Sequence, residues 1–155
     1  MKTKNIIMAI CMAATPLLGA CTLETSDNGK LDGFWHLVQV DTLATGGVRD
    51  MAREKVFWGV QFKLISTQMA DGESCYFRFK HTGDSLIVNS PYWNHGHESA
   101  DSTSTAPSGD IPVTDASLLA PFGINSLEEH FYVEKLTGSR MILRSNLYRL
   151  NFKKF

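Results

Sequence analysis

The sequence predicts an all-β fold, an up-and-down antiparallel β-barrel of about eight strands with one short helix. Two observations support this prediction. Short segments in which apolar and polar residues alternate recur from residue 33 to residue 155, and turn-forming residues separate them. No long helical segment interrupts the series, so consecutive strands most simply pair antiparallel. Closing such a sheet into a barrel removes its exposed edges.

Composition and charge fit one globular domain with a short appendage. The chain has 155 residues, of which 43% are hydrophobic and 20% are charged. Its formal charge of -1 becomes -3 once Lys2 and Lys4, which lie in a predicted leader, are removed. This balance gives no reason to expect nucleic acid as a partner.

The N-terminal segment predicts export. Lys2 and Lys4 precede an apolar run at residues 6–14, which is too short to span a membrane. The following Leu18-Gly19-Ala20-Cys21 resembles the lipobox of bacterial lipoproteins, which implies cleavage before Cys21 and acylation of its thiol. The alternative is an ordinary secreted protein with a chance cysteine. The expected organisation is a signal peptide at 1–20, the acylated cysteine and a tether at 21–30, and the barrel at 31–155.

Acylation of Cys21 predicts a membrane-anchored protein, since several acyl chains hold a protein on a bilayer durably. Thr22 follows the cysteine, instead of the aspartate that retains many enterobacterial lipoproteins at the inner membrane. We therefore expect the protein to be anchored in the outer membrane, with its domain facing either the periplasm or the cell exterior. Residues 22–30 are mostly polar and predict a tether.

The first half of the barrel begins with a strand at residues 33–41 and a long connection at 42–55, with a helical turn near 50–55. The clearest alternation follows at 56–65, where a single strand is expected to turn five side chains toward the core: Val56, Trp58, Val60, Phe62 and Leu64. Cys75, Phe77 and Phe79 mark the inward face of the next strand. A turn at 82–84 joins it to a strand at 86–88.

The second half begins with an irregular stretch at 89–113, and an eighth strand is expected within 90–95 or 110–113. Thr114-Asp115 predicts the start of a short helix that runs to Ala120 and ends at Pro121 and Gly123. Three strands complete the series, at about 130–136, 140–145 and 147–155.

The opening of the first strand carries a family resemblance. Gly33-Phe34-Trp35 resembles the Gly-x-Trp opening of lipocalins, and the mature chain resembles the uncharacterised lipocalin-like lipoproteins of gut Bacteroidota. The resemblance implies a lipocalin-like barrel. It also implies that Trp35 closes the barrel base against an arginine near the last strand, either Arg144 or Arg149.

The predicted ligand site is a set of aromatic side chains that point into the barrel. An eight-stranded barrel holds either packed side chains or one small ligand, so these residues either line a cavity or fill the interior. The set comprises Trp35, Trp58, Phe62, Phe77, Phe79, Tyr148 and Phe152.

Residue types that carry chemistry are sparse. No nucleophile elbow, P-loop, metalloprotease helix or dinucleotide fingerprint is present, so we expect no enzymatic activity, cofactor or metal. Cys75 is expected in the core, and His95 and His97 in a solvated loop. Glu128-Glu129-His130 predicts a solvated turn.

The predicted function is non-enzymatic binding of a small apolar or amphipathic ligand, with residues 42–55 and 89–113 as lids over the barrel. The alternative is a solid barrel that binds another protein of the cell envelope. The membrane, through Cys21, is the other expected partner.

Overall fold

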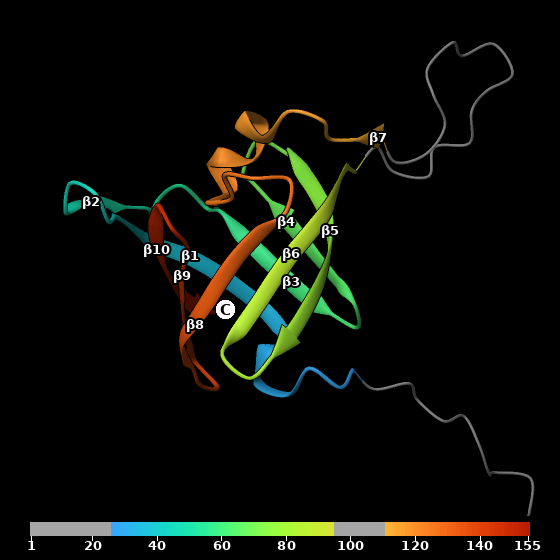
Figure 1. Cartoon of the computed structure of the whole chain (residues 1–155), viewed down its shortest axis with the longest axis horizontal. Coiled ribbons are helices and arrows are strands. Elements are labelled where there is room, and N and C mark those ends of the chain that lie inside the picture. The colour runs from blue at the N-terminus through green and yellow to red at the C-terminus, as the bar shows by residue number, and fades with distance from the viewer. Residues whose placement is uncertain (1–25, 95–110) are drawn as a thin grey trace, which may run out of the picture.

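A computed structural model describes residues 26–94 and 111–155 and shows a closed antiparallel β-barrel (Figure 1). Each barrel strand pairs with its neighbours, and the last strand pairs with the first. This architecture confirms the predicted fold. The eight barrel strands, in chain order, are β1 (Gly33–Thr42), β3 (Phe57–Gln61), β4 (Leu64–Gln68), β5 (Ser74–Thr82), β6 (Ser85–Trp93), β8 (Glu129–Leu136), β9 (Arg140–Arg144) and β10 (Tyr148–Lys154).

Short elements surround the barrel. Strand β2 (Gly47–Asp50) pairs with the end of β1 to form a projecting ribbon, in a segment that was predicted to be a connection without a strand. A hydrogen-bonded turn at 51–54 follows it. Strand β7 (Ile111–Pro112) pairs with β6, and a 3-10 helix, η1 (Gly29–Leu31), precedes β1. In the described part of the chain, no helix has the length and apolar character needed to cross a membrane.

The single strand predicted at residues 56–65 is wrong, because the chain turns back at Phe62-Lys63 to form the hairpin of β3 and β4. The turn reverses the phase of the side chains. Val60 and Ile65 are buried, Leu64 is only partly buried, and Phe62 is 45% exposed. Strand β4 is therefore the missing eighth barrel strand. The predicted locations at 90–95 and 110–113 instead hold the end of β6 and the two-residue β7.

The mouth of the barrel is the end covered by the 3-10 helix η2 (Ala116–Phe122), which lies above the strands in Figure 1. As predicted, Asp115 caps this helix by accepting a hydrogen bond from the backbone of Ser117, and Gly123 ends it in a left-handed conformation. Leu119, Phe122 and Ile124 around this helix are fully buried. They close this end of the core.

The base is the opposite end, with η1 and the turns at 62–63, 83–84 and 137–139. Trp35 is fully buried there and donates its indole N–H to the carbonyl of Leu31 at 2.8 Å. The Nζ atom of Lys154 lies 4.8 Å from the centroid of the Trp35 ring. Gly33 leaves room for this lysine, since a Cβ there would lie 2.4 Å from Lys154 Cε.

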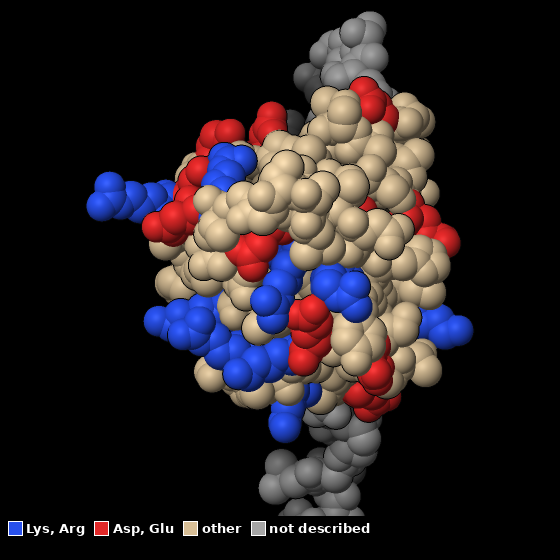
Figure 2. Space-filling model, turned by 60° about the vertical axis from the view of Figure 1, so that its left-hand side comes forward, with Lys and Arg blue, Asp and Glu red and all other residues tan. Residues whose placement is uncertain are grey.

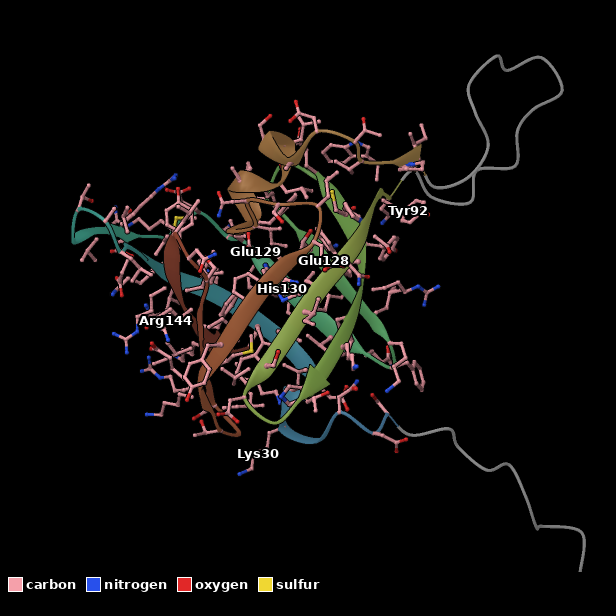
Figure 3. The ribbon with its side chains drawn as sticks, viewed as in Figure 1. Lys30, Tyr92, Glu128, Glu129, His130 and Arg144 are labelled. Atoms are coloured by element: carbon pink, nitrogen blue, oxygen red, sulfur yellow. The ribbon has the colours of Figure 1, made fainter. Side chains whose placement is uncertain are left out.

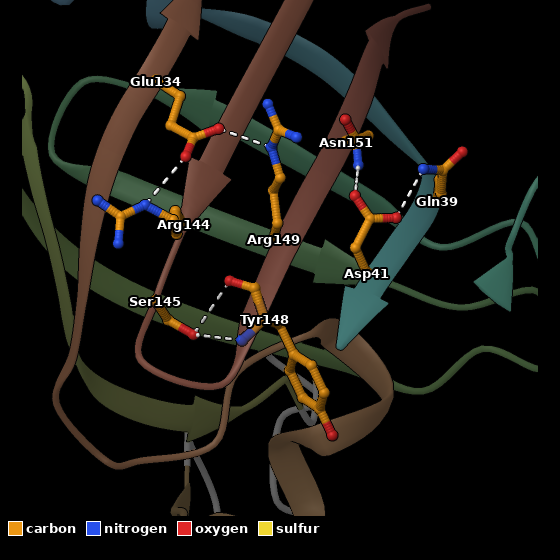
Figure 4. A network of polar contacts seen from close by, with 8 residues as sticks. All are labelled: Gln39, Asp41, Glu134, Arg144, Ser145, Tyr148, Arg149 and Asn151. Carbon is orange, nitrogen blue, oxygen red and sulfur yellow. Dashed lines mark hydrogen bonds and ion pairs between the residues drawn. The ribbon is translucent and has the colours of Figure 1, made fainter. Parts of the chain in front are cut away.

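Neither of the two arginines expected at Trp35 contacts it. Arg144 and Arg149 both bind Glu134 on the outside of the barrel, at 2.9 Å and 2.6 Å (Figure 4). The register explains the difference, since Arg149 pairs with Asp41 at the far end of β1, whereas Lys154 pairs with Trp35. A lysine takes the place that the family resemblance assigned to an arginine.

Candidate functional site

Five of the seven aromatic residues predicted to point inward are buried in the barrel core. Trp35, Trp58, Phe77 and Phe152 are each at most 1% exposed, and Phe79 is 8% exposed. Tyr148 is partly buried against this cluster. Phe62 lies outside the barrel, because the β3–β4 turn places it on the surface.

The buried aromatic side chains pack against one another. The ring centroid of Trp58 lies 5.0 Å from that of Phe152 and 6.0 Å from that of Phe131. The indole N–H of Trp58 donates to the carbonyl of Phe122 at 3.1 Å. A cavity that admits water or a ligand leaves accessible surface on its walls, and these side chains have almost none. In the described part of the chain, no space that admits a ligand therefore adjoins these buried side chains.

An open groove lies instead on the outer wall of the barrel. Its volume is about 1010 Å³, and it runs across strands β1, β3, β4 and β5 beside Ser26 and Asp32. The residues that define it are Phe34, Gly59, Phe62, Leu64, Tyr76 and Arg78. We call this depression the outer groove.

The sheet register produces the outer groove. Phe34, Gly59, Ser66 and Tyr76 are consecutive cross-strand partners on β1, β3, β4 and β5. The two small residues form a floor between two aromatic side chains, whose strands lie about 14 Å apart at the usual strand spacing. A Cβ added at Gly59 would lie 3.4 Å from the Phe34 ring, so any larger side chain would occupy the groove.

Basic side chains border the outer groove. Lys63 lies in the β3–β4 turn and Arg78 lies on β5, and in the described part of the chain neither forms an ion pair. Asp32 is the one acidic residue among the described residues that line the groove, and its carboxylate accepts hydrogen bonds from Ser26 at 2.7 Å and Asn28 at 2.8 Å. The groove therefore combines an apolar floor and walls with two cations available to an acidic group.

Sequence reasoning missed this surface. The alternation at residues 56–65 places Gly59 on the outward face, but its adjacency to Ser66 depends on the register of the unrecognised hairpin. Periodicity within one strand carries no information about the residue beside it on the next strand.

Cys75 lies in the core, as expected. Its side chain is fully buried, and burial, together with the nearby charge of Glu73, raises the pKa of its thiol from 9.0 to about 12. The thiolate is the reactive form of cysteine. Cys75 is therefore a core-packing residue, and its thiol is not accessible as a nucleophile.

We predict that Cys75 resists thiol reagents at pH 8 in the folded protein. A native thiol titration should give the same count for the protein and its Cys75→Ala variant, whereas denaturation should reveal one additional thiol in the unsubstituted chain. Between about pH 9 and 12 the unfolded thiol ionises while the folded thiol stays protonated, so this group lowers stability as pH rises. Reaction of Cys75 in the native protein would contradict its buried placement.

The remaining candidate groups do not converge on one site. Glu128 and His130 are paired at 3.0 Å, with both side chains largely exposed (Figure 3), whereas Glu129 is buried and accepts a hydrogen bond from the backbone of Asn125. His95 and His97 lie outside the described residues. Among the described residues, no cluster of three or more His, Cys, Asp or Glu side chains could hold a metal ion.

Comparison with known proteins places the barrel among similar folds. A family model described as a lipocalin-like domain matches residues 16–155. A lipocalin-like protein from Bacteroides uniformis ATCC 8492 is 22% identical with a TM-score of 0.59, covering 82% of this chain and 100% of that chain. An uncharacterized protein from Bacteroides eggerthii DSM 20697 is 20% identical with a TM-score of 0.55, covering 80% and 98%. No curated protein matches the sequence.

Proposed function

This chain belongs to the lipocalin-like domain family, and we propose that it is a membrane-anchored, non-enzymatic binding protein that holds a small amphipathic molecule in its outer groove. Family membership confirms the resemblance drawn from Gly33-Phe34-Trp35. The barrel fold is consistent with ligand binding. The proposed site lies on the outer wall of the barrel, whereas the sequence predicted a site in its interior.

The cross-strand row formed by Phe34, Gly59, Ser66 and Tyr76 carries this proposal. Two aromatic walls and a floor without large side chains suit a flat or chain-like apolar group. Lys63 and Arg78 at the border suit an anionic group at one end of that molecule. The ligand class is therefore an apolar body with a single acidic group, such as a fatty acid or an acidic aromatic compound.

Acylation of Cys21 and location in the outer membrane are part of the proposal, and the signal-like segment at residues 1–20 supports them. Absence of enzymatic activity is also part of it. Catalysis by a nucleophile or an acid–base pair needs groups that converge in a cleft, whereas Cys75 is buried and the Glu128–His130 pair lies on the open surface.

We predict that Gly59→Leu weakens ligand binding without unfolding the barrel. The backbone at Gly59 is one that other residues adopt, and its missing side chain leaves the groove open, so leucine fills the site. The full chain titrated with the fluorescent fatty acid cis-parinaric acid should bind it saturably. Gly59→Leu should weaken the affinity by about tenfold or more, equivalent to about 1.4 kcal/mol.

Gly138→Leu is the matched control. Gly138 lies in a turn away from the groove, and a Cβ added there meets no atom within 4 Å. Arg78→Gln should reduce the preference for the acid over its methyl ester. Binding that survives Gly59→Leu but is lost in Phe77→Ala would return the site to the barrel interior. No binding to the unsubstituted chain would favour the alternative of a solid barrel that binds another protein of the cell envelope.

A further inference from the structure

We infer that the barrel base docks on the anionic surface of the bilayer in which the protein is anchored, so that the mouth points away from the membrane. The inference rests on the proposed acylation of Cys21 and adds a defined orientation to it. Three independent features of the described residues support it: the entry point of the tether, exposed aromatic side chains and the distribution of charge.

The tether enters the fold at the base and is held there. Ser26 Oγ accepts a hydrogen bond from the backbone N–H of Phe62 at 2.9 Å, and the side chain of Asn28 donates to the carbonyl of Phe62 at 2.6 Å. Only four residues separate Cys21 from Ser26, so five Cα–Cα steps join them. A chain of that length spans at most about 18 Å, so an acylated Cys21 keeps the β3–β4 turn close to the bilayer.

Exposed phenylalanine rings lie near the same end of the barrel. Phe62 is 45% exposed in the base turn, and Phe34 is 36% exposed at the start of β1. Phe155 is 86% exposed and is held beside Phe34 by a 2.8 Å hydrogen bond from its N–H to the Phe34 carbonyl. Water solvates such rings poorly, whereas the headgroup region of a bilayer accommodates aromatic and other apolar side chains.

Charge is distributed unequally between the two ends. Figure 2 shows lysine and arginine side chains gathered at the lower left of the barrel, and Lys30 projects from the base in Figure 3. The exposed basic residues toward the base are Lys30, Lys63, Lys80, Lys135, Arg140 and Lys153, beside exposed Asp27 and Asp84. The exposed acidic residues toward the mouth are Asp50, Glu54, Asp71, Glu73, Asp115 and Glu128, beside Arg49, Arg53, Lys55 and the two arginines, Arg144 and Arg149, that bind Glu134.

This asymmetry orients the barrel at an anionic surface. Basic side chains near such a surface are attracted to it, and the attraction decays within a Debye length. The mouth carries no comparable excess of basic side chains, so the same surface attracts it less. Because the tether already keeps the base within that range, the attraction favours the base-down orientation.

Depth-dependent fluorescence quenching tests the orientation. The acylated full chain is reconstituted into vesicles of phosphatidylcholine with phosphatidylglycerol, carrying either Ser139→Cys in a base turn or Ala120→Cys in η2 at the mouth, each labelled with bimane. Both positions are exposed, and Cys75 is buried with a thiol pKa raised to about 12, so the label goes to the new cysteine. Spin-labelled lipids should quench the base label and leave the mouth label unaffected.

Charge reversal supplies the matched comparison. Lys30→Glu with Lys63→Glu and Lys153→Glu should cause loss of quenching at the base label. The same number of reversals near the mouth, Arg49→Glu with Arg53→Glu and Lys55→Glu, should leave it unchanged. Raising the salt concentration should reduce base quenching in the unsubstituted protein.

The outcomes separate the inference from the proposed anchor. A protein that fails to float with the vesicles lacks the anchor, which refutes the proposed acylation. A protein that floats but shows equal quenching at both labels is anchored without a fixed orientation, which overturns the inference alone. Base quenching that survives charge reversal would mean that electrostatic attraction does not hold the base at the bilayer.

Discussion

Trp58→Ala is expected to destabilise the protein by about 3–5 kcal/mol, the usual cost of removing a large buried aromatic side chain. Trp58 is fully buried and packs against Phe152 and Phe131. Its indole N–H also satisfies the carbonyl of Phe122, so truncation removes a hydrogen bond between β3 and η2. Small domains have about 5–15 kcal/mol of stability in total, so the loss is a large fraction of it.

Urea unfolding followed by circular dichroism measures this effect as a lower midpoint with an unchanged slope. Trp58→Phe keeps most of the ring but leaves the Phe122 carbonyl unpaired, and should cost about 1–3 kcal/mol. Val48→Ala, at a residue 67% exposed on β2, should change stability by about 0.5 kcal/mol or less. A near-neutral Trp58→Ala would mean that the barrel interior is not packed as described.

The same variant tests where ligands bind. If the interior is filled in the unsubstituted protein, Trp58→Ala creates an apolar cavity that was absent before. An engineered cavity of this kind takes up small apolar molecules. Trp58→Ala should therefore gain affinity for benzene while its binding of parinaric acid in the outer groove is retained. Loss of fatty acid binding would instead support the interior site that the aromatic pattern first predicted.

Much of the barrel could be predicted from alternation within single strands. The inward faces of β5 and β10 follow directly from the apolar residues at every second position, and burial of Phe77 and Leu150 confirms them. The helix caps at Asp115 and Gly123 were also predictable, since both residues have local chemistry suited to helix ends. These features depend on only a few neighbouring residues.

The predictions were wrong where no local sequence pattern indicates the structure. Phe62-Lys63 contains no glycine, asparagine or aspartate, yet Phe62 adopts a positive φ of 52° in a two-residue turn. The turn is stabilised from a distance, because Ser26 and Asn28 bond to the backbone of Phe62. Without that hairpin the register of β4 against β3 and β5 was unknown, and the outer groove could not be located.

The wrong prediction of an arginine at Trp35, where Lys154 lies, has the same origin. Position along the last strand places several basic residues near the expected site, and only the register of β10 against β1 selects among them. The arginine that the family resemblance implied at Trp35 is therefore wrong, and Lys154 lies there instead.

Gly123→Ala is expected to cost about 2–5 kcal/mol through two separable contributions. Gly123 has a φ of +83°, and a side chain in this left-handed conformation costs about 1–2 kcal/mol. The added Cβ would also lie 2.9 Å from both terminal methyl carbons of Leu150, which is fully buried on β10. Such overpacking costs a further 1–3 kcal/mol, roughly.

Gly72→Ala separates the two contributions. Gly72 has a φ of +93°, but a Cβ there meets no atom within 4 Å, so only the conformational cost of about 1–2 kcal/mol applies. The difference between the two variants in urea unfolding measures how tightly η2 is packed on the barrel. Because Phe122 precedes Gly123 and accepts the hydrogen bond from Trp58, displacement of η2 should also shift the Trp58 indole N–H resonance. Equal destabilisation by both variants would mean that η2 yields freely, and that the mouth is loosely covered rather than sealed.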